Sequence, residues 1–211
     1  MEAVTTPVLD WDVAERSLDG HGESGDQCLV KLFGHGALVA VADGLGHGRE
    51  AAVAAKTAMA TLEEDAGQPV AVLLRRCHER LRPTRGAALS LVSFNARDGT
   101  MSWLGVGSVE GVLLRADRAA SRPAERLVLR GGVVGRQLPP LRVVVVRVEP
   151  GDTLLLATDG IREGFEDKLT VSDVAGPTAA RILAEHAKGT DDALVVVARY
   201  LGACRSTARA T

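Results

Sequence analysis

The chain has 211 residues, of which 46% are hydrophobic and 25% charged, with a formal net charge of -2 and a pI near 6.2. This length is enough for one good hydrophobic core and predicts a single domain. The near-neutral charge supplies no basic field, which argues against nucleic acid as the main partner. The longest apolar runs, such as residues 143–146, are far too short to cross a bilayer, so no membrane association is expected.

The cysteines and the start of the chain indicate a cellular compartment. Cys28, Cys77 and Cys204 are odd in number and lack the spacing of metal ligands. No charged and then apolar leader opens the sequence. These features predict a protein of the reducing cytoplasm, and we expect it to be a monomer.

The first half of the chain predicts a β-hairpin followed by two helices. Strand-like runs at 27–33 and 37–42 flank Gly34-His35-Gly36, whose composition favours a tight turn. The alanine-rich run at 49–64 favours a helix. A second helix is predicted from Pro69, because apolar residues follow at helical spacing: Val70, Leu73, Leu74, Cys77 and Leu81.

The second half predicts an antiparallel meander that ends in a helix and a strand. The expected strands are 88–95, 101–106, 109–115, 126–129, 141–148 and 153–157, separated by Gly, Pro and Asp. A helix over 177–187 and a strand over 193–199 follow. The predicted fold is α+β, with two antiparallel sheets face to face and helices outside. We expect one domain over 1–204 and a flexible tail over 205–211.

Four acidic motifs recur in a fixed order along the chain. They are Ser-Gly-Asp26, Val-Ala-Asp43-Gly44, Ala-Thr-Asp159-Gly160 and Asp191-Asp192. Three of them begin or end hydrophobic, β-branched runs, so strand ends would bring carboxylates to one edge of a sheet. Carboxylates gathered without matching bases favour Mg²⁺ or Mn²⁺ over zinc, which prefers imidazole or thiolate. Taken alone, each Asp-Gly pair could equally be a surface turn.

This ordered set resembles the PPM-type, or PP2C-like, metal-dependent serine/threonine protein phosphatases, over nearly the whole chain. The loop Asp43-Gly-Leu-Gly-His-Gly48 is similar to the form found in the SpoIIE-like branch. The resemblance implies a PP2C-like α-β-β-α sandwich. It also implies hydrolysis of phosphoserine or phosphothreonine by water activated between two Mn²⁺ or Mg²⁺ ions, without a covalent phosphoenzyme. The substrates that it implies are phosphorylated STAS-domain proteins of the stressosome, with the enzyme acting as negative feedback in bacterial stress signalling.

The resemblance also implies roles for individual residues. Asp43 would bridge two metal ions, and the carbonyl of Gly44 would bind the second. Asp159 and Asp191 would hold the first ion. Asp26 would belong to the metal site through a metal-bound water molecule, so Asp26 and Asp43 are both metal-site and catalytic candidates. The neighbouring Asp192 would belong to the outer shell.

The loop after Asp43 departs from the animal members of the family. Those proteins place a histidine two residues after the bridging aspartate, where this chain has Leu45. His47 comes later and is a catalytic or substrate-contacting candidate, although it could simply open the following helix. We expect Leu45 to matter more for packing than for chemistry.

Other interpretations stay open. A catalytically silent PPM-fold module that binds a phosphoprotein is the main alternative, and a two-metal phosphoesterase acting on a small molecule or nucleic acid is another. A basic helix end offers either a solvated face or a docking patch for an acidic partner; it contains Arg75, Arg76, Arg80, Arg82 and Arg85. Trp11 and Trp103 are expected to anchor the core or its rim.

Overall fold

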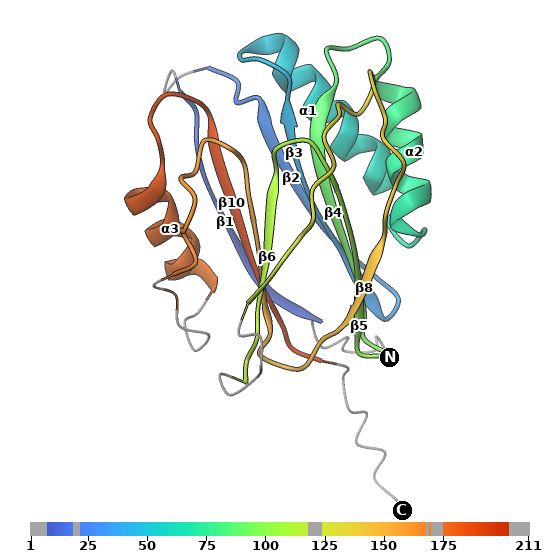
Figure 1. Ribbon diagram of the computed structural model, residues 1–211, viewed down its shortest axis with the longest axis vertical. Coiled ribbons are helices and arrows are strands. Elements are labelled where there is room, and N and C mark those ends of the chain that lie inside the picture. Colours follow the sequence, from blue (N-terminus) through green and yellow to red (C-terminus); the bar gives the residue numbers. More distant parts are fainter. Residues whose placement is uncertain (1–7, 19–21, 118–123, 168, 170–174, 203–211) are drawn as a thin grey trace, which may run out of the picture.

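Two antiparallel sheets lie face to face, with two helices on one outer side and a third helix on the other (Figure 1). The computed structural model describes residues 8–18, 22–117, 124–167, 169 and 175–202. The helices are α1 (Arg49–Glu64), α2 (Val70–Leu81) and α3 (Ala175–His186). Helices α1 and α2 contact one sheet, whereas α3 contacts β1 and β10 of the other. The predicted α-β-β-α arrangement is therefore confirmed.

Each sheet has five strands among the described residues. One sheet has the order β2-β3-β4-β5-β8, formed by β2 (Asp26–Phe33), β3 (Gly36–Gly44), β4 (Ala87–Asn95), β5 (Thr100–Val106) and β8 (Val144–Arg147). The other has the order β1-β10-β9-β6-β7, formed by β1 (Leu9–Arg16), β10 (Ala193–Tyr200), β9 (Thr153–Ala157), β6 (Glu110–Leu114) and β7 (Ala124–Arg126). All paired strands run antiparallel.

Strand β1 was not predicted from the sequence. It pairs with β10 from Leu9↔Tyr200 to Arg16↔Ala193, so its partner lies at the far end of the chain. Only Leu9 of this edge strand is fully buried, and charged residues interrupt its apolar pattern. Two predicted strands were too long or displaced, since β7 shares only Arg126 with the predicted 126–129 and β8 is shorter than the predicted 141–148.

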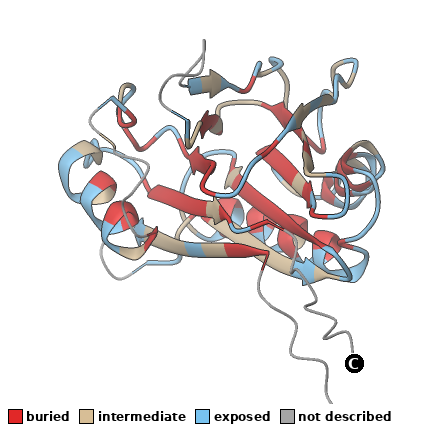
Figure 2. Cartoon of the chain, turned by 90° about the horizontal axis from the view of Figure 1, so that it is seen from below, coloured by how far each residue is buried: buried red, intermediate tan, exposed pale blue. Residues whose placement is uncertain are grey.

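Strand β3 shows how one run of residues serves two hydrophobic layers. Side chains alternate along a strand, so neighbours point to opposite faces. Val39 and Val41 join the core between the two sheets. Leu38 and Ala40 instead join the core under α1 and α2. Figure 2 shows the resulting buried strands in the interior and the exposed outer faces of the helices.

Aromatic side chains close the space between the sheets. Phe94 of β4 and Tyr200 of β10 stack with ring centroids 5.7 Å apart. Trp103 is also buried there, as expected, whereas Trp11 is 44% exposed on the edge strand. Of the two expected positions, the core or its rim, Trp11 is therefore not in the buried core. Because side chains alternate along a strand, Trp11 lies on the same face of β1 as Leu9 and Val13, which both contact this core.

A few sequence-based expectations concern features outside these layers. No helix among the described residues is long and apolar enough to cross a membrane. Cys77 is buried and Cys28 partly buried, and both are free thiols. The single domain over 1–204 stays a prediction, and the proposed tail at 205–211 lies outside the described residues.

Leu156→Ala should destabilise the protein by about 2–5 kcal/mol, because it removes a fully buried side chain from the core between the sheets. Leu32→Ala is the matched control, since Leu32 also lies in a strand but is 48% exposed, and it should cost about 0.5 kcal/mol. Urea unfolding followed by circular dichroism measures both. Similar losses for the two variants would contradict the inter-sheet core.

Candidate active site

Two of the predicted carboxylates face each other across the β2–β3 hairpin. Asp26 opens β2 and is register partner to Asp43, one residue before β3 ends. Asp26 is buried, whereas Asp43 is half-buried. The amide of Gly44 donates to the carbonyl oxygen of Gly25 over 3.0 Å, which extends the pairing by one step beyond the acidic pair. The hairpin therefore fixes the two aspartates at one edge of this sheet.

A threonine joins this pair to the second sheet. The hydroxyl of Thr158, directly after β9, donates to Asp26 Oδ2 over 2.7 Å. The same hydroxyl accepts from the amide of Leu194 in β10 over 2.9 Å. Because Asp159 follows Thr158, and Asp191 and Asp192 precede β10, this link gathers the remaining acidic motifs around the same edge.

Asp192 uses both carboxylate oxygens to hold the backbone. Its Oδ1 accepts from the amide of Leu18 over 2.8 Å and its Oδ2 from the amide of Gly25 over 2.6 Å. These bonds tie the segments before β2 and after β1 to the start of β10. Asp192 thus positions the segment that carries Asp26, and its predicted place in the outer shell of a metal site stays a prediction.

Two glycines permit approaches that no side chain would allow. A Cβ at Gly44 would lie 2.0 Å from the carbonyl oxygen of Ala51, so α1 can pack directly against the end of β3. A Cβ at Gly160 would lie 1.9 Å from the carbonyl oxygen of Asp192. The Asp-Gly pairs of the motifs therefore have a packing reason in addition to turn formation.

Ser108 and Thr158 are site residues that the sequence analysis did not assign. Ser108 Oγ donates to Asp43 Oδ2 over 3.2 Å from the turn between β5 and β6. Thr158 is part of the Ala-Thr-Asp159-Gly160 motif, so its position beside Asp159 could have indicated a place in the site. Ser108 had only the weaker signal of a Gly-rich turn, and its contact with Asp43 joins residues 65 positions apart.

Burial and neighbouring carboxylates raise the pKa of Asp26 and that of Asp43. Burial raises the pKa of Asp26 to about 8, with further increases from Asp43, Asp192 and Asp159, against a decrease from the Thr158 hydrogen bond. Burial also raises the pKa of Asp43 to about 7, and Asp159 adds to the shift. Among the described residues, none of the ion pairs includes Asp26, Asp43, Asp159 or Asp191. The charge that these carboxylates carry when ionised is therefore not offset by an ion pair within the described residues.

The donor chemistry of this cluster fits a hard divalent cation. In the part of the chain that the structure describes, no three His, Cys, Asp or Glu side chains are close enough to hold a metal ion between them. The predicted ligands nevertheless all offer oxygen atoms, and their charge lacks a basic partner. Asp159 and Asp191 are exposed and Asp43 is half-buried, so they form an accessible rim around the buried Asp26.

The loop after Asp43 is exposed. His47 makes no hydrogen bond with any described residue, and its catalytic role stays a prediction. Leu45 is 49% exposed, and its amide donates to the carbonyl oxygen of Gly86 over 3.0 Å. The expectation that Leu45 matters more for packing than for chemistry stays a prediction.

Comparisons with known proteins place this fold among phosphatases. The phosphoserine phosphatase RsbX of Bacillus subtilis (strain 168) is 25% identical over 149 residues, which cover 71% of this chain and 73% of RsbX. A chain from a structure described as "The bacterial stressosome: a modular system that has been adapted to control secondary messenger signaling" is 29% identical, with a TM-score of 0.81, covering 90% of this chain and 99% of that one. A crystal structure of RsbX in complex with magnesium is 20% identical, with a TM-score of 0.81 and coverage of 95% and 98%.

The four-layer fold, the order of its acidic motifs and these relatives define a phosphatase of the PP2C class. The family model for Stage II sporulation protein E (SpoIIE) matches residues 34–201. The chain therefore belongs to the SpoIIE family. The matched region contains three of the four acidic motifs; Asp26 precedes it.

The stability of the metal-free protein should fall as the pH rises from about 4 to about 8. The pKa of Asp26 and that of Asp43 are above their ordinary value of 3.8, so over this range the folded state binds more protons than the unfolded state. Their unfavourable contribution is absent below about pH 4 and complete above about pH 8. Asp26→Asn should therefore gain stability over the wild type as the pH rises, measured by urea unfolding in EDTA. A constant difference between the two proteins would contradict the raised pKa.

Thr158→Val should cost about 1–3 kcal/mol of stability, because it leaves the buried amide of Leu194 and a buried oxygen of Asp26 without the hydroxyl partner. Thr158→Ser is the control, since it keeps the hydroxyl and loses only a methyl group. Thermal and urea unfolding in EDTA measure both. A Val variant as stable as the Ser variant would show that the hydroxyl does not hold the two sheets together.

Proposed function

We propose that this protein is a metal-dependent phosphatase that removes phosphate from serine or threonine side chains of a protein, using two Mg²⁺ or Mn²⁺ ions. The observation that carries the proposal is the group of strand-end carboxylates that both sheets bring to one edge, without a basic partner among the described residues. The relative RsbX is named a phosphoserine phosphatase, and RsbX has been crystallised with magnesium.

The proposed ligand set is the one that the resemblance to the PP2C-like phosphatases implies. Asp43 would contact both ions and the Gly44 carbonyl the second, while Asp159 and Asp191 would hold the first. When bound, the two ions would lower the pKa of a water molecule and offset negative charge on the phosphoryl group. Asp26 would orient that water, and Ser108 fixes the carboxylate of Asp43 through its hydrogen bond.

The reaction as proposed needs no covalent bond between protein and phosphate. The water oxygen attacks phosphorus, the bond from phosphorus to the serine or threonine oxygen breaks, and that oxygen takes up a proton. His47 lies exposed in the loop beside Asp43 and is the proposed side chain for contact with the leaving group. The exposed rim of the site suits a phosphorylated residue presented on the surface of a folded protein.

We further propose that the substrates are phosphorylated STAS-domain proteins of the stressosome and that dephosphorylation supplies negative feedback in stress signalling. The similarity to a chain from a stressosome structure supports this assignment. The proposed location is the cytoplasm, where the free thiols of Cys28 and Cys77 would remain reduced.

Asp43→Asn should abolish phosphate release, because it removes the charge of the proposed bridging ligand while keeping the side-chain volume. The assay measures phosphate released from a phosphorylated STAS-domain protein and from phosphoserine and phosphothreonine peptides, with Mn²⁺ or Mg²⁺ titrated against EDTA. Asp98→Asn, at an exposed turn between β4 and β5, is the matched control and should keep wild-type activity.

Two results would contradict the proposal. Wild-type turnover by Asp43→Asn would remove this residue from the reaction. Binding of phosphoprotein by the wild type without release from any substrate would favour the catalytically silent module instead.

A further inference from the structure

A basic pocket of about 510 Å³ lies beside the candidate active site. Helix α1 contributes Arg49, Glu50 and Val53 to its lining, the segment after α2 contributes Pro83 and Arg85, and the segment before β8 contributes Arg136. Three arginines and one glutamate leave the lining with an excess of positive charge. This sign is opposite to that of the neighbouring acidic edge.

The pocket and the acidic edge share one loop. The amide of Leu45, two residues after Asp43, donates to the carbonyl oxygen of Gly86 over 3.0 Å. The guanidinium group of Arg85 lies against the same loop, because a Cβ at Gly46 would be 2.9 Å from Arg85 Nη1. A protein segment with its phosphorylated residue at Asp43 can therefore extend over this loop into the pocket.

Two of the three arginines keep their charge available. Arg85 forms an ion pair with Glu50. Arg49 and Arg136 form no ion pair with a carboxylate among the described residues. The Nε–H of Arg136 donates a hydrogen bond to the carbonyl oxygen of Arg85 over 3.3 Å. The side chains of Arg49 and Arg136 are both exposed. Val53, 47% exposed, adds an apolar surface for the stem of a bound side chain.

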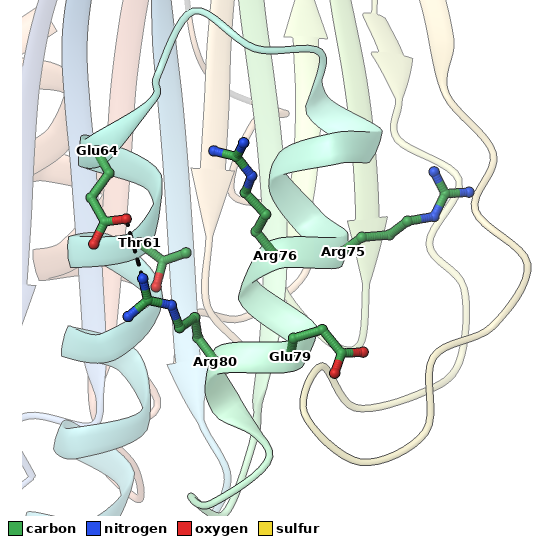
Figure 3. Close-up of a pocket in the computed structure, with 6 residues that line it drawn as sticks. All are labelled: Thr61, Glu64, Arg75, Arg76, Glu79 and Arg80. Carbon is green, nitrogen blue, oxygen red and sulfur yellow. Dashed lines mark hydrogen bonds and ion pairs between the residues drawn. The ribbon is translucent and has the colours of Figure 1, made fainter.

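A second pocket with arginines does not share this property. It lies on the outer faces of α1 and α2, where Figure 3 shows Arg80 linked to Glu64. Arg76 pairs with Asp65. Most of the positive charge of the basic helix end is thus compensated, as expected for a solvated face. Arg75 projects to the other side of α2 from Arg80 and supplies a control position (Figure 3).

We propose that the pocket formed by Arg49, Val53, Arg85 and Arg136 binds acidic side chains next to the phosphorylated residue of the protein substrate. Guanidinium groups bind carboxylates in a planar, bidentate geometry, which suits aspartate and glutamate. The aspartates of the site would repel acidic side chains of the substrate. Attraction to the arginines beyond the loop would therefore direct these acidic side chains into the pocket. The proposal rests on the proposed phosphatase function and adds a sequence preference to it.

Two phosphoserine peptides of equal length test this preference, one with Asp and Glu on both sides of the phosphoserine and one with Asn and Gln at those positions. Phosphate release with Mg²⁺ or Mn²⁺ gives kcat/KM, and anisotropy of the fluorescein-labelled peptides gives Kd. The wild type should prefer the acidic peptide. Arg49→Gln and Arg136→Gln should each reduce this preference about three- to fivefold, as expected for an exposed ion pair. Arg75→Gln should leave it unchanged.

The outcomes separate the two proposals. Equal kcat/KM and equal Kd of the wild type for both peptides would overturn the pocket, as would an Arg49→Gln/Arg136→Gln double variant that keeps the full preference. If the wild type releases no phosphate from either peptide, the phosphatase proposal fails. The anisotropy measurement still decides the pocket in that case, because tighter binding of the acidic peptide that depends on Arg49 and Arg136 requires no turnover.

Discussion

The hydroxyl group of Thr158 connects the two sheets at the edge where the carboxylates gather. It donates to Asp26 at the start of β2 and accepts from Leu194 in β10, so one side chain spans the boundary between the layers. Asp192 adds a parallel connection to the amide of Gly25. Face-to-face packing of sheets brings their edges close together but leaves their relative position adjustable by small sliding. These hydrogen bonds fix that position, and the geometry of the acidic edge depends on them.

Holding several aspartates together has an electrostatic cost in the absence of a cation. Burial and mutual repulsion raise the pKa of Asp26 to about 8 and that of Asp43 to about 7. The inter-sheet core opposes this cost, with strands β3, β9 and β10 buried over most of their length. A divalent cation would compensate the same charge directly. The fold thus keeps an unfavourable arrangement that suits metal binding better than it suits stability.

The short loop between β3 and α1 places opposite charges side by side. Gly44 allows α1 to pack closely against the end of β3, because no Cβ separates it from Ala51. Arg49 begins α1 only six residues after Asp43, and Arg85 brings the segment after α2 against Gly46 in the same loop. An acidic edge and a basic pocket joined by one loop suit a phosphorylated segment that needs both a reaction centre and a docking surface.

Local patterns in the sequence were enough to predict the β2–β3 hairpin, both helices of the outer layer and the order of the acidic motifs. Helical spacing in α2 and turn residues between the strands act over a few positions, so no tertiary contact is needed to recognise them. Strand β1 and the contacts of Ser108 and Thr158 could not be predicted, because their partners lie 36 or more residues away in the chain. The sequence by itself determined which carboxylates are available at the strand ends. Only the packing of the two sheets decided how far each carboxylate is buried and which hydroxyl orients it, since burial and hydrogen bonding depend on neighbours from other strands.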